Sequence, residues 1–143
     1  MEDEPRLVTG TAGVVDRLMG WVILVASACT LGMLILATTP WEAPASALGG
    51  IAALTGWCVS PYLGLAAVRR LARSPGQRVL SLVVSAGTAS FGLLVLGDVL
   101  VVHRGLLNAL VTMVVPGYQW GAVLAGGAAV LIWRLAQRGE SAP

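Results

Sequence analysis

Four long apolar stretches dominate the pattern of hydrophobic and polar positions along the chain. They cover residues 18–39, 45–68, 79–102 and 118–135, and short polar segments separate them. A helix rises about 1.5 Å per residue, so about 20 residues cross a hydrocarbon core about 30 Å thick. The pattern therefore predicts an all-α integral membrane protein, a bundle of four transmembrane helices. We expect a single domain over residues 1–143, with short disordered ends at 1–10 and 138–143.

Arginine placement predicts the orientation of these helices. Eight arginines fall on one side of the predicted membrane: Arg6, Arg17, Arg69, Arg70, Arg73, Arg78, Arg134 and Arg138. The other side has Arg104 alone. Short loops rich in basic residues stay in the cytoplasm, so we predict that both termini are cytoplasmic. Because the connecting loops are short, we also expect successive spans to be antiparallel neighbours.

Composition favours the same class of protein. Of the 143 residues, 57% are hydrophobic and 11% are charged, whereas soluble domains average about 45–50% and about 25%. The net charge of +2 comes from arginines beside the predicted spans. Orientation explains them there, so no nucleic-acid partner is expected. We expect a bacterial-type inner (cytoplasmic) membrane, with membrane lipid around the bundle.

The segment 103–117 lies between the third and fourth stretches and has an amphipathic pattern, with apolar residues at helical spacing against Asn108 and Thr112. Three structures would fit: a short helix in the outer interface, a continuation of span three, or a segment that docks on a partner. We favour the interfacial helix, because Pro116 and Gly117 would then supply a break before span four.

Small residues recur at every fourth position in two of the stretches, which is typical of helix-packing faces in lipid. Span two carries Ala52, Gly56, Ser60 and Gly64, and span four carries Gly117, Gly121, Ala125 and Ala129. One interpretation is that both faces close the protein's own bundle, and the other is that at least one faces another subunit. The first is favoured, because four helices already need several internal contacts.

Asp98 is the one acidic residue inside a predicted stretch, and a carboxylate within a membrane is a candidate functional group. It lies near the outer interface, where water can solvate it, so a structural role is favoured over a proton relay. A cluster with His103 or Arg104 would require the helix to end or bend, because offsets of five and six residues place neither on the same helical face.

Three further residues are candidates for a ligand site. Trp57 lies far from either interface beside Pro61, whose ring should displace the Trp57 carbonyl. Trp57 would then line a pocket for a lipid, quinone or pigment, or simply fill space. Tyr118 and Gln119 fall at the predicted outer mouth of span four, as a recognition edge or as part of an ordinary aromatic belt. Other tryptophans near predicted interfaces are interpreted as anchors: Trp21, Trp41, Trp120 and Trp133.

The sequence predicts no enzyme, cofactor or metal. His103 is the single histidine, which excludes a bis-histidine haem, and no nucleophile elbow, phosphate loop or metalloprotease motif occurs. In length and hairpin order the chain is similar to small four-span proteins that extrude cations. Those proteins place a carboxylate deep in the first span, whereas residues 18–39 contain none. Four-span fluoride channels share the size, but their polar-helix motifs do not occur here.

These observations leave three hypotheses for the function. The first is a non-enzymatic accessory or assembly subunit that associates with other membrane-protein subunits or with itself. The second is a small oligomeric transporter or channel, with Asp98, Trp57 and Pro61 along its path. The third and weakest is a subunit that binds a pigment or quinone.

Overall fold

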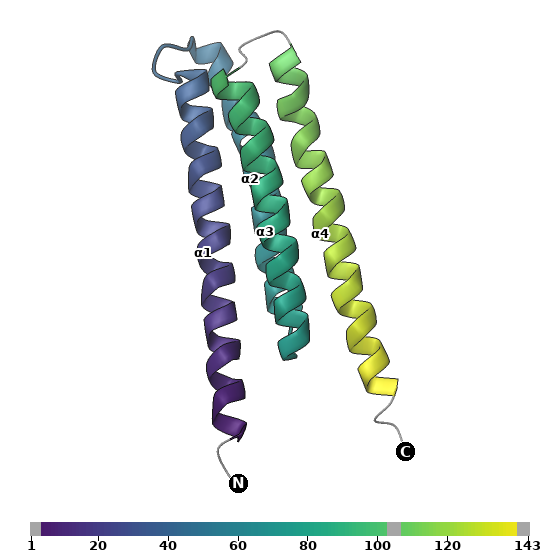
Figure 1. Cartoon of the computed structure of the whole chain (residues 1–143). Helices are drawn as coiled ribbons and strands as arrows, with labels where there is room; N and C mark the ends of the chain where they lie inside the picture. The colour runs from purple at the N-terminus through teal and green to yellow at the C-terminus, as the bar shows by residue number, and fades with distance from the viewer. Residues whose placement is uncertain (1–3, 103–106, 140–143) are drawn as a thin grey trace.

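The computed structural model describes residues 4–102 and 107–139, which form helices joined by short turns (Figure 1). The elements are α1 (Glu4–Thr38), α2 (Ala45–Leu71), α3 (Pro75–Gly97), the short π-helix η1 (Asp98–Val102) and α4 (Leu107–Gly139). Four segments are long and apolar enough to cross a membrane: Gly13–Thr38, Ala45–Leu71, Pro75–Leu100 and Leu110–Arg138. The prediction of an all-α chain is confirmed for the described residues, and so is the prediction of four helices long and apolar enough to span a membrane.

The predicted boundaries at the chain ends and before the fourth span need correction. Residues 4–10 belong to α1 and residues 138–139 to α4, so these parts of the predicted disordered ends are helical. The separate interfacial helix is also wrong for residues 107–117, because they form the start of α4 and Pro116 lies inside that helix. Residues 98–102 continue α3 as η1, while residues 103–106 lie outside the described ranges.

The α1–α2 turn contains a strained residue. Thr39 has a φ of 38°, which is unusual for a β-branched side chain. Its N–H donates to the Ile35 carbonyl at 3.1 Å, and its own carbonyl accepts from the Glu42 N–H at 2.9 Å. The position just after a helix commonly has this left-handed conformation and usually carries glycine. Thr39 therefore ends α1 at a conformational cost.

The α2–α3 turn is stabilised by a capping box. Gln77 donates its backbone N–H to Ser74 Oγ at 3.3 Å, and Gln77 Oε1 accepts from the backbone N–H groups of Arg73 (2.9 Å) and Ser74 (3.2 Å). Pro75 is the first residue of α3, where its missing N–H costs nothing. The polar Gln77 side chain is buried, and its Oε1 is satisfied by two residues of this turn.

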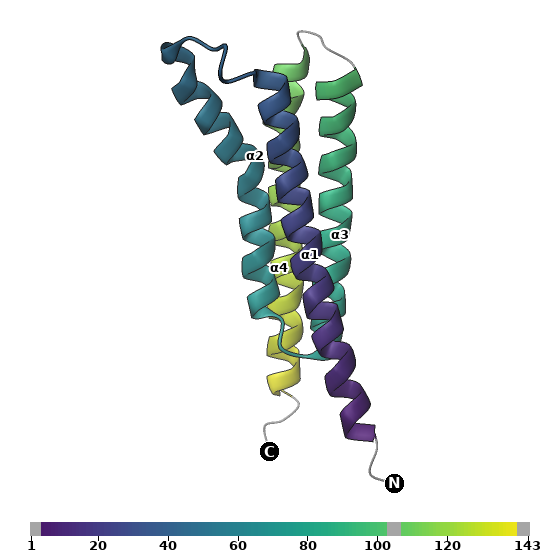
Figure 2. The ribbon, with the colours of Figure 1, turned by 90° about the vertical axis from the view of Figure 1, so that its left-hand side faces the viewer.

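The four helices are arranged in a ring in the order α1, α3, α4, α2 (Figures 1 and 2). The parallel pairs α1/α3 and α2/α4 are neighbours, as are the antiparallel pairs α1/α2 and α3/α4. Among the described residues, α1 and α4 do not pack on each other. Successive helices are therefore antiparallel neighbours in two cases, but α2 and α3 lie across the diagonal. At the start of α3, Gly76 lets the ring of Trp133 of α4 approach, since a Cβ there would lie 3.0 Å from that ring.

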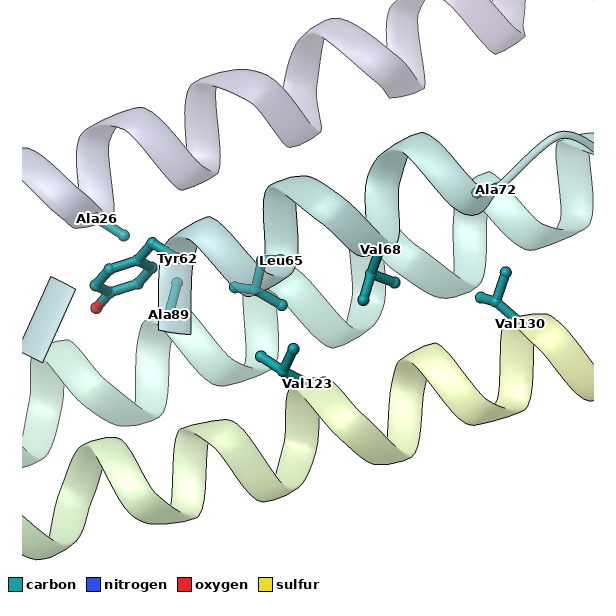
Figure 3. Close-up of a cluster of buried hydrophobic side chains, with 8 residues drawn as sticks. All are labelled: Ala26, Tyr62, Leu65, Val68, Ala72, Ala89, Val123 and Val130. Atoms are coloured by element: carbon teal, nitrogen blue, oxygen red, sulfur yellow. The ribbon is translucent and has the colours of Figure 1, made fainter. Parts of the chain in front are cut away.

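The apolar core is thin and contains many small side chains. Figure 3 shows its buried members: Ala26, Tyr62, Leu65, Val68, Ala72, Ala89, Val123 and Val130. They come from all four helices and from the α2–α3 turn. In lipid the hydrophobic effect does not drive helices together, so tight contact between helices must supply much of the packing energy.

Glycines provide that tight contact at two places. A Cβ on Gly64 of α2 would lie 2.8 Å from Val123 Cγ1 and 3.0 Å from the Trp120 ring, both on α4. A Cβ on Gly126 of α4 would lie 2.8 Å from Val84 Cγ1 of α3. The two distances of 2.8 Å are too short for a real side chain, so glycine at these two positions lets α4 approach α2 and α3 closely.

The predicted small-residue faces divide between the inside and the outside of the bundle. On α2, Ser60 and Gly64 contact α4, whereas Ala52 and Gly56 are exposed. On α4, all four members are exposed: Gly117, Gly121, Ala125 and Ala129. The interpretation that the α4 face closes the protein's own bundle is wrong, because the opposite face of α4 is buried instead. Packing of the exposed face against another subunit stays a prediction.

The first half of α2 stands away from the other helices (Figure 2). The buried residues of α2 begin at Cys58, so nothing from Ala45 to Trp57 is buried. From Cys58 to its end, α2 packs on both α1 and α4. The change occurs beside Pro61, and a proline inside a helix is an established cause of bending.

Candidate functional site

A cluster of buried polar groups joins all four helices within the membrane-spanning part of the bundle. We define this polar cluster as Thr30 of α1, Tyr62 of α2, Thr88 of α3 and Gln119 of α4. The four residues are 0%, 1%, 6% and 1% exposed, respectively. Polar side chains inside a membrane are costly unless they are hydrogen-bonded, so their convergence is a specific feature of the fold.

Gln119 occupies the centre of the polar cluster. Its Nε2 donates to the Thr88 carbonyl at 3.2 Å and to the Tyr62 hydroxyl at 3.5 Å. The Tyr62 hydroxyl lies 3.0 Å from Thr30 Oγ1. Since the Thr88 carbonyl can only accept, Nε2 must face it, and Oε1 has no hydrogen-bond partner among the described residues. Gln119 thus contacts α2 and α3, and through Tyr62 it is connected to α1.

Gly92 of α3 makes room for this glutamine. A Cβ at position 92 would collide with the Gln119 side-chain amide and would lie 3.3 Å from the Tyr62 hydroxyl. The pair is therefore matched in shape, because the long Gln119 side chain lies against a residue that has no side chain. The prediction that places Gln119 at the outer mouth of span four does not fit, because α4 begins about three turns before this residue.

The chemistry of the polar cluster is that of hydrogen bonding. It contains hydroxyl and amide groups and no carboxylate or imidazole. Interhelical hydrogen bonds in membranes contribute about 0.6 kcal/mol on average and up to about 2 kcal/mol. The cluster can therefore fix the relative heights of the four helices.

Pro61 lies next to a second hydrogen-bonded contact between α2 and α4. A proline cannot donate to the carbonyl four residues before it, which here is the Trp57 carbonyl. Ser60 Oγ donates to that carbonyl at 2.8 Å and accepts from Trp120 Nε1 of α4 at 2.9 Å. The acceptor displaced by Pro61 is thus paired. Trp120 points into the bundle, so its interpretation as an interfacial anchor is wrong.

The carbonyl that Pro116 of α4 displaces is also paired, here by a side chain of α2. It removes the helical donor to the Thr112 carbonyl, and Cys58 Sγ of α2 donates to this oxygen at 3.6 Å. One residue further along, the Met113 carbonyl accepts from Trp57 Nε1 at 3.0 Å. The carbonyl that each proline displaces therefore has a hydrogen-bond partner, and α4 continues through Pro116.

Trp57 lies beside an apolar groove between the outward-leaning half of α2 and α4. The groove has a volume of about 580 Å³ and is lined by Gly50, Ala53, Leu54, Trp57 and Met113. Trp57 is 43% exposed, so it does not fill space inside the bundle. Binding of a lipid, quinone or pigment at this groove stays a prediction.

An ion pair that the sequence analysis did not identify joins α1 to α2. Arg69 donates from Nε to Asp16 Oδ1 at 2.8 Å and from Nη2 to Asp16 Oδ2 at 2.7 Å. The two side chains are 32% and 41% exposed, at the end of the bundle where α1 begins and α4 ends. A Cβ on Gly20 would meet Arg69 Nη1 at 2.8 Å, so this glycine lets the guanidinium lie against α1.

The remaining candidates lie apart from the polar cluster. Asp98 is the first residue of η1 and is exposed, and Tyr118 is 69% exposed on the outer face of α4. His103 and Arg104 lie outside the described residues, so the predicted cluster with Asp98 is untested.

Comparisons with known proteins do not assign this chain to a family. No protein-family model, curated protein or solved structure gives a significant match to this chain.

Proposed function

We propose that this protein is a non-enzymatic membrane subunit that associates with other transmembrane helices. The observation that carries the proposal is the position of Gly117, Gly121, Ala125 and Ala129 on the exposed face of α4. The bundle is closed by the opposite face, which buries Val115, Gln119, Val123 and Val130. Small residues at every fourth position let a second helix approach closely, which is the main source of association energy in lipid.

Space around the two glycines of this face supports the proposal. A Cβ on Gly117 or Gly121 would meet nothing within 4 Å from other helices of the described residues. These glycines therefore serve no close approach inside the bundle, unlike Gly64 and Gly126. A helix of another subunit on this face would give them the role that the other two have within the chain.

The test is native mass spectrometry of the protein, extracted in mild detergent from its own host membrane. We expect reproducible co-migration with other membrane polypeptides. Gly121→Leu should abolish it, whereas Gly87→Leu should preserve it. Gly87 is a matched control, because it is also exposed, helical and without neighbours within 4 Å. Recovery of the native protein always free of other polypeptides would overturn the proposal, and a homo-oligomer alone would favour a small oligomeric transporter instead.

The proposal includes a location, with the bundle in a bacterial-type inner membrane and both termini in the cytoplasm. The support is the distribution of arginine, since eight of the nine flank the ends of helices on the side of the termini. Fusion of a reporter that is active only in the cytoplasm to the C-terminus should give a signal. A signal only from a reporter that requires export would reverse this orientation.

A further inference from the structure

Two adjoining cavities lie along α1 and α2 at the arginine-rich end of the bundle. The first, which we call the cationic cavity, has a volume of about 430 Å³ and is lined by Asp16, Ala66, Arg69, Arg70, Ala72 and Arg78. The second, the apolar groove of α1, has a volume of about 400 Å³. Ala66 and Arg69 belong to both linings, so the groove opens beside the charged cavity.

The cationic cavity has the chemistry of a phosphate site. Three guanidinium groups and one carboxylate line it, so its formal charge is positive. The carboxylate of Asp16 is held by the bidentate pair with Arg69, which fixes that guanidinium at the junction of the two cavities. Arg70 is exposed on the same lining. Guanidinium groups bind phosphate oxygens through paired N–H donors, so this arrangement is complementary to an anionic headgroup.

The apolar groove of α1 has the chemistry of an acyl-chain site. It follows about three turns of α1, from Gly20 through Leu24 and Ala28 to Leu31, with Val59 of α2 opposite. The one hydroxyl in the lining, Ser27 Oγ, donates to the Ile23 carbonyl at 2.7 Å. Because that hydroxyl is paired within its own helix, the groove presents hydrocarbon to whatever lies in it.

We propose that these two cavities together bind one anionic phospholipid, with its phosphate in the cationic cavity and one acyl chain in the apolar groove of α1. A free phosphate ion would occupy only the charged cavity and would leave the adjoining groove unused. The continuity of the two linings at Ala66 and Arg69 is what selects a lipid. This site is separate from the exposed α4 face and does not depend on the subunit proposal.

The first experiment measures lipid binding to the purified full chain in detergent by native mass spectrometry. The probes are phosphatidylglycerol and phosphatidylcholine with identical acyl chains. We expect one phosphatidylglycerol to be retained and phosphatidylcholine to be bound much more weakly. The double variant Arg70→Gln/Arg78→Gln should weaken phosphatidylglycerol binding about tenfold or more, since each arginine near an anionic surface contributes about fivefold. Equal binding of the two lipids would overturn the proposal.

A matched double variant separates a specific site from general attraction. Arg134→Gln/Arg138→Gln removes the same charge at the same end of the bundle, but neither residue lines the cationic cavity. We expect it to change phosphatidylglycerol binding by less than about twofold. An equal loss in both double variants would show a general charge effect and would overturn the proposal.

The groove is tested independently of the arginines. Ala28→Trp fills it, whereas Ala67→Trp places the same ring on an exposed position of α2 outside both linings. We expect Ala28→Trp to reduce retention of phosphatidylglycerol and Ala67→Trp to preserve it. If Ala28→Trp has no effect, and inorganic phosphate raises the thermal midpoint as much as the lipid does, the cavity is a site for a free anion and the lipid proposal fails.

Discussion

Trp120 of α4 donates its indole N–H to Ser60 Oγ of α2 at 2.9 Å, directly beside the proline that bends α2. The same hydroxyl donates to the Trp57 carbonyl that Pro61 has displaced. One serine therefore satisfies a displaced acceptor within its own helix and a donor from another helix. This makes the bend of α2 and its contact with α4 a single structural unit.

Ser60→Ala should destabilise the bundle, because it leaves the Trp57 carbonyl and the Trp120 N–H without their partner. We expect a loss of about 1–3 kcal/mol in the free energy of unfolding. The measurement is an SDS-unfolding titration in mixed micelles, followed by tryptophan fluorescence. Ser60→Thr keeps the hydroxyl and serves as the control. Equal stability of Ser60→Ala and the wild type would show that the serine hydroxyl does not support the bend.

Gly92→Ala should also destabilise the bundle, because the added methyl group would collide with the Gln119 amide. The expected loss is about 1–3 kcal/mol, as for other overpacked interiors. Gln119→Ala removes the colliding group, so the double variant should lose less than the sum of the two single variants. A double-mutant cycle in the same titration measures this coupling, and strict additivity would argue against the matched fit of the two residues.

Replacing Thr39 by glycine should stabilise the protein. The residue has a φ of 38°, which glycine adopts without steric cost. We expect a gain of about 1 kcal/mol, seen as a higher thermal midpoint in mild detergent. The neighbouring Thr38→Gly lies within α1 and should have the opposite sign, since glycine weakens a helix. A lower midpoint for Thr39→Gly would contradict the assignment of strain to this residue.

The Asp16–Arg69 pair should contribute little to stability despite its bidentate geometry. Both side chains are partly exposed, so solvent screens their attraction. We expect Asp16→Asn to cost about 0–1 kcal/mol and the loss to shrink further as salt is raised. Thermal unfolding of wild type and variant at low and high salt measures both effects. A larger loss that salt does not change would show that the pair is effectively buried.

Sequence predicts the four spans well, because the length and polarity of each stretch are local properties set by the bilayer. The start of α4 is harder to predict, because Pro116 and Gly117 read as a helix break. In the structure the helix continues through Pro116, and Cys58, which is far away in the sequence, donates to the Thr112 carbonyl that the proline leaves without its helical donor. A compensation of this kind between two helices leaves no local signal.

The packing faces show the same limit. Small residues at every fourth position look alike whether they face a neighbour in the chain, as Gly64 does, or the outside, as Gly121 does. The polar cluster can be predicted only in part from the sequence. Gln119 was a candidate, but Thr30 and Tyr62 lie on other helices, and nothing local indicates that they meet it. The sequence held one signal for the ion pair of Asp16, because the start of α1 and the end of α2 must lie close together in an antiparallel pair.

The position of α4 in the ring has a consequence for the order in which the protein forms during synthesis. Among the four helices, α1 emerges from the ribosome before α2 and α3, and α4 follows them. Until α4 arrives, Tyr62 lacks the amide of Gln119, Ser60 lacks the indole of Trp120, and Cys58 lacks its carbonyl acceptor. The first three helices therefore enter the membrane with their polar contacts to α4 incomplete. Of these four helices, the one that is translated after the other three locks their relative heights.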